Sequence, residues 1–319
     1  MSTSPRLFCL DTVMIDIVMR ISSIPKSGSD VLASQHLLTT GGGYNAMSSA
    51  ARQGLAVSYA GRLGTGPFST IASASLDRDG VVHDIVPNPD LDNGFCVALV
   101  DPEGERTFIT SRGAEGTLRS SDLAELQVRP GDYVLLSGYN FMDPLPSEVI
   151  LSWLGDLADD VVVTFDPSNR VRDIPQGHLD AVLARADWMV CNEYEAVQLV
   201  GGATPGESAV ALAEMTGRRG VVVRHGATGC TVALDDDLPV TVAGFATDVV
   251  DTNGAGDTHN GVLLAELAHG AGPLEAARRA NAAAAIAVSQ FGPATCPSRD
   301  AIDQWIESRE MTLGVTDVT

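Results

Sequence analysis

Residues 248–261 read Asp-Val-Val-Asp-Thr-Asn-Gly-Ala-Gly-Asp-Thr-His-Asn-Gly. This stretch joins an apolar lead-in, a turn of nearly bare backbone and a small-residue, apolar run that predicts a helix. Gly254 and Gly256 let backbone N–H groups approach a ligand closely, because glycine has no side chain. The helix that follows directs its positive N-terminal end at the same place. The stretch therefore predicts an anion-binding site.

Asp257 stands at the mouth of this predicted site, where its carboxylate would repel a bound phosphate. The position is understandable if Asp257 takes a proton from an alcohol while the anion site stabilises a phosphoryl group in transfer. The alternative is a purely structural turn, since glycine-rich turns before helices are common. In this stretch an aspartate, two glycines, a second aspartate and a predicted helix follow one another directly, and this combination favours the functional interpretation.

The segment from Asp251 to Asp257 resembles the C-terminal signature of the PfkB, or ribokinase-like, carbohydrate kinases, DTxGAGDxFxxG. The chain departs from this signature at His259, where the family has an aromatic residue, and we expect His259 to pack or to face the substrate. The resemblance covers nearly the whole chain and implies one kinase domain over residues 1–319 that uses ATP and Mg²⁺. The catalytic residues that it implies are Asp257 as general base and Gly254, Ala255 and Gly256 as the anion site.

Composition narrows the class of protein. The chain has 319 residues, 45% of them hydrophobic, and a net charge of −21. This length supports one large α/β core, or a core with an appendage. The acidic charge repels nucleic-acid backbones and anionic membrane surfaces, so we expect neither as a partner. The five cysteines lie far apart without a CxxC pair, and no run of 18 apolar residues occurs, which predicts free thiols in a cytoplasmic protein without a membrane span.

Two other enzyme classes do not fit the sequence. Lys26 is the only lysine, and no GxxxxGK[ST] motif exists, which excludes a Walker-type NTPase. Schiff-base chemistry would need Lys26 itself, which sits in a turn flanked by proline and glycine. No GxGxxG follows the first predicted strand, which argues against a dinucleotide-binding dehydrogenase.

Short apolar segments alternate with helix-like segments along most of the chain, which predicts βαβ units and a mostly parallel sheet with helices on both faces. With the family resemblance, this predicts a ribokinase-like three-layer αβα sandwich. The predicted strands are Leu7–Leu10, Val57–Ala60, Tyr133–Ser137, Val161–Phe165, Trp188–Cys191 and Val221–Arg224, and the predicted helices include Ala46–Gln53, Pro146–Leu157 and Gly206–Thr216.

Two stretches break this alternation and predict antiparallel hairpins. Val13–Ile21 and Val31–Thr39 flank a turn, and Phe95–Val100 and Arg106–Ser111 flank another, with no helix between the partners. We expect a small separate β-sheet. In ribokinase-like proteins the corresponding segments, here about 13–40 and 94–112, form a lid over the sugar and often a dimer contact, so a homodimer through this lid is expected.

The resemblance places the substrate site near the N-terminus. It implies that Asp16 and Asn45, with the backbone of Gly42 and Gly43, bind hydroxyl groups. The family usually has a glycine where this chain has Asp11. The alternative for Asp16 is a carboxylate facing solvent on an alternating strand.

Two further residues are candidate substrate contacts. Arg112 closes the second hairpin near Glu115 and could reach the substrate or the γ-phosphate, and the alternative is a solvent-exposed ion pair between the two. Tyr139 is expected to help decide the substrate, together with Met14, Tyr44 and Arg112.

Asn192 and Glu195 match the family's NxxE motif, which implies that Glu195 binds Mg²⁺ beside the phosphates. A helix capping box is the structural alternative, because the two residues are three apart. Asp251 matches a segment that encloses potassium in ribokinases, so activation by K⁺ is an open expectation. The expected nucleotide contacts are Asn192, Arg224, Gly226, Gly229 and Asn281.

These observations predict an ATP-dependent kinase of a small sugar, polyol or nucleoside. A binding protein that kept the fold and lost the chemistry is the competing hypothesis, because a fold alone does not define a function. The intact Asp257 and its flanking glycines favour the kinase.

Overall fold

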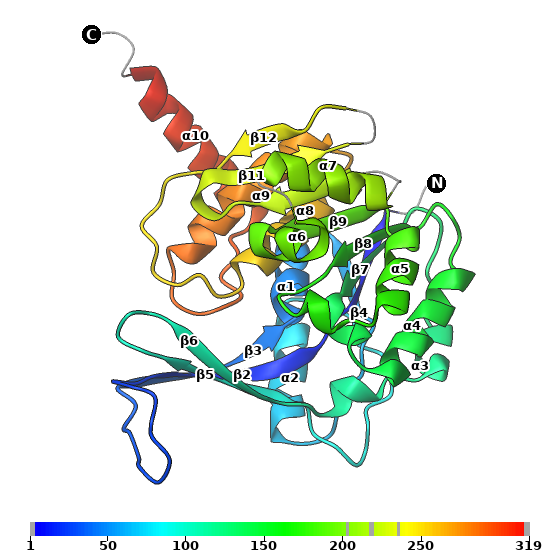
Figure 1. Ribbon diagram of the computed structural model, residues 1–319, viewed down its shortest axis with the longest axis vertical. Coiled ribbons are helices and arrows are strands. Elements are labelled where there is room, and N and C mark those ends of the chain that lie inside the picture. The colour runs from blue at the N-terminus through cyan, green and yellow to red at the C-terminus, as the bar shows by residue number, and fades with distance from the viewer. Residues whose placement is uncertain (1–3, 202–203, 217–219, 235–236, 316–319) are drawn as a thin grey trace.

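The computed structural model describes residues 4–201, 204–216, 220–234 and 237–315. Its centre is an eight-stranded sheet with the strand order β12-β11-β10-β9-β8-β7-β1-β4 (Figure 1). Six neighbouring strands of this sheet run parallel, namely β10, β9, β8, β7, β1 and β4. β11 pairs antiparallel with β10, and β12 with β11. The bounds are β1 Arg6–Leu10, β4 Ala56–Tyr59, β7 Tyr133–Ser137, β8 Val162–Asp166, β9 Trp188–Asn192, β10 Gly220–Arg224, β11 Gly229–Ala233 and β12 Val240–Ala243.

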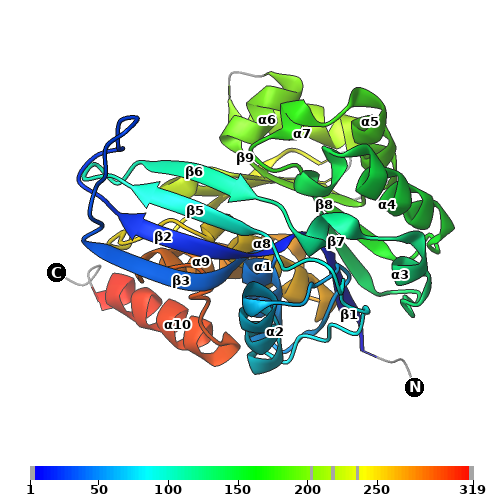
Figure 2. The same ribbon diagram turned by 90° about the horizontal axis from the view of Figure 1, so that it is seen from below.

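Helices cover both faces of this sheet, so the predicted three-layer sandwich is confirmed (Figures 1 and 2). One face carries α3 Ser120–Ala124, α4 Pro144–Asp156, α5 Gln176–Arg185, α6 Glu193–Val200 and α7 Pro205–Thr216. The other face carries α1 Tyr44–Arg52, α2 Pro67–Arg78, α8 Ala255–Ala268, α9 Pro273–Val288 and α10 Arg299–Val315.

Alternation along each strand divides the apolar side chains between the two layers. On β1, Phe8 and Leu10 enter the core beneath α4 and α5, whereas Leu7 and Cys9 enter the core beneath α1. A parallel strand that is covered on both faces must be apolar at every position, which explains the unbroken apolar runs in the sequence. All five cysteines are buried free thiols in this structure, as the spacing predicted.

A second, smaller sheet has the order β3-β2-β5-β6 and stands away from the central sheet (Figure 2). Its strands are β2 Val13–Arg20, β3 Gln35–Gly42, β5 Phe95–Val100 and β6 Arg106–Ser111. The β2–β3 and β5–β6 pairs are antiparallel, which confirms the two predicted hairpins, and β2 pairs with β5 in parallel. We call this four-stranded unit the small sheet.

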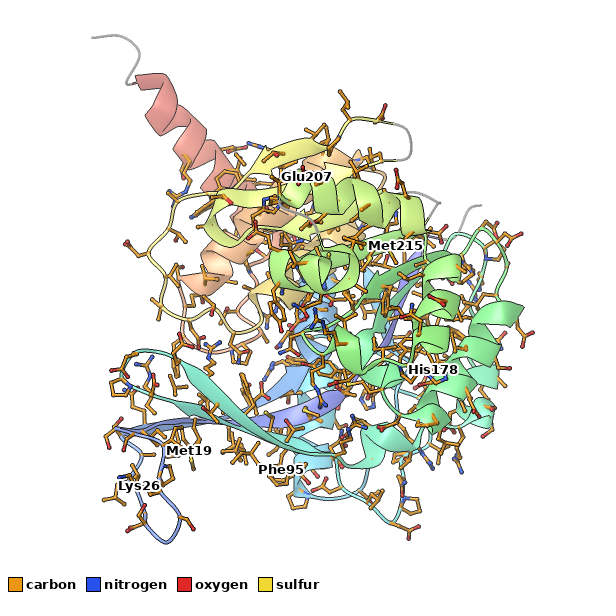
Figure 3. The ribbon with its side chains drawn as sticks, in the orientation of Figure 1. Met19, Lys26, Phe95, His178, Glu207 and Met215 are labelled. Atoms are coloured by element: carbon orange, nitrogen blue, oxygen red, sulfur yellow. The ribbon has the colours of Figure 1, made fainter. Side chains whose placement is uncertain are left out.

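The start of β3 in the small sheet differs from the sequence prediction. β3 begins at Gln35 rather than Val31, because the backbone N–H of Ser34 closes the loop onto the carbonyl of Arg20 and leaves Leu32 exposed. Figure 3 shows Lys26 on this loop, at the outer end of the small sheet and away from the ends of the central strands. This placement agrees with the exclusion of lysine chemistry.

The strands β11 and β12 were not predicted from the sequence. β11 begins at Gly229, whose φ is 106°, and pairs antiparallel with β10, and β12 pairs antiparallel with β11. No helix within the described ranges is long and apolar enough to cross a membrane.

Candidate active site

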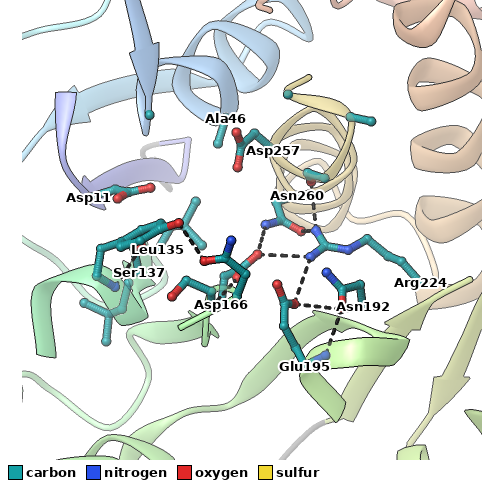
Figure 4. A pocket seen from close by; sticks show the side chains of 18 of the residues that line it. Asp11, Ala46, Leu135, Ser137, Asp166, Asn192, Glu195, Arg224, Asp257 and Asn260 are labelled. Carbon is teal, nitrogen blue, oxygen red and sulfur yellow. Dashed lines mark hydrogen bonds and ion pairs between the residues drawn. The ribbon is translucent and has the colours of Figure 1, made fainter. Parts of the chain in front are cut away.

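A cavity of about 490 Å³ opens at the carboxyl ends of five neighbouring strands of the central sheet (Figure 4). Asp11 follows β1, and Ser137, Asp166, Asn192 and Arg224 are the last residues of β7, β8, β9 and β10. Ligands of open parallel sheets bind at this edge. The other lining residues are Gly42, Ala46, Arg106, Leu135, Leu136, Tyr139, Ser168, Asn169, Glu195, Thr252, Gly254, Ala255, Gly256, Asp257 and Asn260.

The predicted anion turn lies on this cavity. Gly254 caps α8 in the left-handed conformation, with φ of 73°, which an L side chain adopts only at a cost. The helix therefore begins at Ala255, whose N–H donates to the carbonyl of Thr252 at 3.3 Å, and its positive end is directed at the cavity. Gly256 packs against the Arg224 guanidinium so closely that an added Cβ would be 3.1 Å from Nη1 of Arg224.

Asp257 occupies the first turn of α8 and faces the same cavity. Its Oδ2 accepts a hydrogen bond of 3.1 Å from Nδ2 of Asn45. The pKa of Asp257 is raised to about 6, and burial is the largest cause of the rise. The hydrogen bond from Asn45 and the charge of Arg224 oppose the rise, and the charge of Asp166 adds to it. A carboxylate in this condition is ionised at neutral pH yet basic enough to accept a proton.

The N-terminal substrate residues collect beside Asp257. Asp16 lies over the backbone of Gly41, where an added Cβ would be 2.1 Å from its Oδ2, so it does not project freely into solvent as the alternative had it. Burial and the charge of Asp257 raise the pKa of Asp16 to about 6, and Asn253 and Arg106 lower it. Gly42 lines the cavity at the end of β3, and Gly43 and Asn45 follow directly.

Arg112 and Glu115 do not form the solvent-exposed ion pair that was the alternative interpretation of Arg112. Arg112 pairs with Asp143, is about half exposed and is not among the residues that line the cavity. Glu115 is buried and accepts hydrogen bonds from the backbone N–H groups of Gly94 and Gly113. The cationic side chain that the small sheet presents to the cavity is Arg106, on β6.

Tyr139 lines the cavity and donates its hydroxyl proton to Oδ1 of Asn169 at 2.9 Å. Burial and then the charge of Asp11 raise its pKa, so the phenol stays protonated and can donate to a ligand or to Asn169.

Arg224 is the centre of a network at the other end of the cavity (Figure 4). Its Nη1 donates to the Gly256 carbonyl at 2.9 Å and to Oδ1 of Asn260 at 2.6 Å. Its Nη2 lies 3.2 Å from Oδ2 of Asp166 and 3.7 Å from Oε2 of Glu195. Burial alone would lower the pKa of Arg224, but the two carboxylates raise it above its usual value. A permanent positive charge therefore stands between the anion turn and the carboxylates.

The structure contains the capping box that competed with the magnesium interpretation. The Asn192 side chain accepts from the backbone N–H of Glu195 at 2.9 Å, and Oε2 of Glu195 accepts from the backbone N–H of Asn192 at 2.8 Å. The two roles are compatible, because Glu195 also lines the cavity near Asp166. Burial and the charge of Asp166 raise the pKa of Glu195 to about 7, and Arg224 lowers it. Two neighbouring carboxylates open to a cavity suit Mg²⁺, which keeps several of its waters.

Asp251 is engaged by the protein itself. It pairs with Arg106, and its oxygens accept from the backbone N–H groups of Asn253 at 2.9 Å and Gly292 at 3.1 Å. These contacts tie the small sheet to the segment before the anion turn. They account for the side chain without a metal ion.

The remaining predicted nucleotide residues lie beyond the lining of this cavity. Gly226 and Gly229, both with positive φ, flank a short turn after β10. Nδ2 of Asn281 on α9 donates to the carbonyls of Val242 and Ala243. His259 is 2% exposed, and burial lowers its pKa to about 3, so its ring is neutral and packs inside the protein.

The polar residues that line the cavity and that sequence reasoning did not assign to the site include Asp11, Arg106, Asp166 and Asn260. A positional signal existed for three of them. Asp11 and Asp166 stand at the ends of predicted strands, where ligands of parallel sheets bind. Asn260 is three residues after Asp257 and therefore on the same helix face.

The fold has many solved counterparts among ribokinases. The structure of Arabidopsis thaliana ribokinase complexed with ribose and ATP matches with a TM-score of 0.82 and 23% identity, over 95% of this chain and 99% of that one. A putative ribokinase II from E. coli, in its apo form, matches with a TM-score of 0.83 and 22% identity over the same shares. At this level of identity the likeness defines the fold, which is that of the ribokinases.

The sequence comparisons define the family. Residues 4–300 match the profile described as pfkB family carbohydrate kinase. An uncharacterized sugar kinase, YegV of Escherichia coli (strain K12), is 31% identical over 309 residues, which cover 94% of both chains. Ribokinase of Bacillus subtilis (strain 168) is 26% identical over 295 residues, covering 91% of this chain and 95% of that one. The chain belongs to the pfkB family of carbohydrate kinases.

Proposed function

We propose that this kinase transfers the γ-phosphoryl group of ATP to a hydroxyl group of a small sugar, polyol or nucleoside, with Asp257 as general base. The observation that carries the proposal is the position of Asp257 at the N-terminal turn of α8, where its carboxylate and the anion turn face one cavity. One side of this arrangement takes a proton from the acceptor alcohol, and the other receives the negative charge of the phosphoryl group.

The acceptor binds at the end of the cavity that Gly42, Tyr139 and Asp257 line. Asn45 fixes the Asp257 carboxylate through one oxygen, and the other oxygen is free to accept the hydroxyl proton as the alcohol oxygen attacks. Asp16 and the backbone beside Gly42 bind further hydroxyls. This general-base step contributes on the order of 10²–10⁴ in rate.

The phosphoryl groups bind between the anion turn and Arg224. The N–H groups of Gly254, Ala255 and Gly256 and the N-terminal end of α8 stabilise the charge that develops in transfer. Arg224 is already held by Asp166, Asn260 and Gly256, so its charge is in place before ATP arrives. Asp166 and Glu195 would hold Mg²⁺, which neutralises the phosphate oxygens when it is bound.

The small sheet acts as a lid over the acceptor. Arg106 of β6 pairs with Asp251 just before the anion turn, so closure of the lid is coupled to the phosphate end of the site. Lid closure excludes water and suppresses ATP hydrolysis. The edge strand β6 also exposes Phe108 and Ile109, which are 54% and 60% accessible, and these residues support a homodimer through the small sheet.

The proposal is tested by measuring ADP release with Mg·ATP across a panel of pentoses, hexoses, polyols and nucleosides. We expect at least one substrate class to raise ADP release, and chelation of Mg²⁺ by EDTA to abolish the increase. If members of the panel raise the melting temperature but none raises ADP release, the chain is a binding protein on a kinase fold and the proposal is wrong.

A further inference from the structure

Asp11 is a carboxylate that the phosphoryl-transfer scheme above does not use. It follows β1 directly and lines the cavity with Gly42, Tyr139 and Asp257. Figure 4 shows Asp11 and Asp257 at one end of the cavity, whereas Glu195 and Asn192 lie at the other. Asp11 therefore belongs to the acceptor end rather than to the phosphate end.

The protein fixes the Asp11 side chain firmly. The backbone N–H of Thr12 donates to Oδ1 at 2.6 Å, and the Ser137 side chain adds a second hydrogen bond. Gly43 packs directly against it, because a Cβ added at Gly43 would be 2.5 Å from Cβ of Asp11 and 3.1 Å from its Oδ2. A carboxylate held in this way presents its oxygens to the cavity in one orientation.

Within the described residues, no arginine, lysine or histidine forms an ion pair with Asp11. The two arginines that line the cavity are committed elsewhere, Arg224 to Asp166 and Glu195 and Arg106 to Asp251. Burial and the charge of Asp257 accordingly raise the pKa of Asp11 to about 7. A partly buried carboxylate without a cationic partner is costly, and a donor from outside the chain would offset that cost.

We propose that Asp11 is a specificity-determining residue that accepts a hydrogen bond from a second donor group of the acceptor substrate. This inference rests on the proposed function. Because Asp11 and Asp257 lie at one end of the cavity, the substrate class is a diol or an amino alcohol. An analogue that lacks the second donor leaves the remaining acceptor capacity of the Asp11 carboxylate without a partner, and such a site rejects it.

The test compares matched pairs of substrate and deoxy analogue, chosen around the substrate found in the panel, in wild-type protein and in Asp11→Asn. The asparagine keeps the shape and can still accept from Thr12 through its carbonyl oxygen, but it loses the charge. Asp11→Ser provides a second variant if Asp11→Asn folds poorly. Asp30→Asn, in an exposed loop, is the matched control for loss of one negative charge.

We expect the wild type to prefer the diol over its deoxy partner by about 10- to 100-fold in kcat/KM, which is the range of a hydrogen bond to a charged group. In Asp11→Asn this ratio should fall to within a few-fold, while turnover of the deoxy analogue changes little. An amino analogue that is preferred in the wild type and loses more than the diol in Asp11→Asn would identify the donor as an ammonium group. A ratio that is unchanged in both Asp11 variants, or the absence of any preference in the wild type, would overturn the inference.

A second measurement separates this inference from the proposed function. Thermal shifts by each diol and deoxy analogue report binding without turnover. If the wild type releases no ADP but discriminates the pair in binding, and Asp11→Asn does not, then the kinase proposal fails and the role of Asp11 stands. If turnover depends on Asp257 while discrimination survives in Asp11→Asn, only the role of Asp11 fails.

Discussion

Replacing Asp257 with asparagine should lower the rate of phosphoryl transfer by about 10²–10⁴ and at the same time stabilise the unliganded protein. Asparagine keeps the shape of the side chain and its contact with Asn45, but it removes a charge that the folded protein holds out of water. A general base whose pKa is raised toward 7 by burial destabilises the free enzyme when it is ionised. The two effects should therefore have opposite signs in one variant.

The magnitude follows from the pKa. The pKa of the Asp257 carboxyl is raised from 3.8 to about 6, and one pKa unit corresponds to about 1.4 kcal/mol. Ionised Asp257 should thus lower the free energy of unfolding by about 3 kcal/mol at pH 8, and by about half of that at pH 5. The sign follows because the folded protein holds the proton more tightly than the unfolded chain, so stability falls as the pH rises through this interval.

Urea denaturation of the wild type and of Asp257→Asn at pH 5 and pH 8 measures these differences directly. Asp30→Asn should match the wild type at both pH values, because its carboxylate is exposed. If Asp257→Asn is no more stable than the wild type at pH 8, or if its advantage does not grow between pH 5 and pH 8, the carboxylate is not held in the desolvated condition that the argument requires.

Three further results are expected. The kcat/KM of the wild type should fall at least tenfold for each pH unit below about 6, because Asp257 takes up a proton and the pKa values of Asp16 and Glu195 are also raised. A flat profile between pH 5 and pH 8 would contradict the role of Asp257 as base. Gly254→Ala should lower kcat, because Gly254 has φ of 73° and the new Cβ would be 3.3 Å from Nδ2 of Asn45. The left-handed conformation costs alanine about 1–2 kcal/mol. If this variant keeps the wild-type kcat, the position of the anion turn does not control the rate. Arg106→Ala should raise both the KM for the acceptor and the rate of ATP hydrolysis without acceptor, because it frees Asp251 from the small sheet; unchanged kinetics would show that this pair does not couple lid and site.

Much of the fold could be predicted from the sequence, because its signals are local. Strands buried on both faces must be apolar at each position, so segments such as Tyr133–Ser137 stand out, and turns between alternating segments mark the two hairpins. The signals were weakest where a local pattern was absent. β11 depends on pairing with β10 and β12 on pairing with β11, and the start of β3 depends on a loop closure between Ser34 and Arg20.

The site was less predictable than the fold, because a motif names a residue type and not its partner. Arg112 and Arg106 both lie at the end of a hairpin strand in the sequence, but Asp143 binds the first and the cavity receives the second. Asp166 gains its importance only from Arg224 and Asn260, which are 58 and 94 residues away in sequence. Only the folded chain brings such groups together.

Phosphoryl transfer by Asp257→Asn tests the central claim most directly. The measurement is single-turnover formation of the phosphorylated acceptor, beside the binding of ATP and of the acceptor to the same variant. The account predicts a loss of about 10²–10⁴ in the rate of transfer, with both ligands still bound. A rate close to that of the wild type, with both ligands bound, would contradict the assignment of Asp257 as the base.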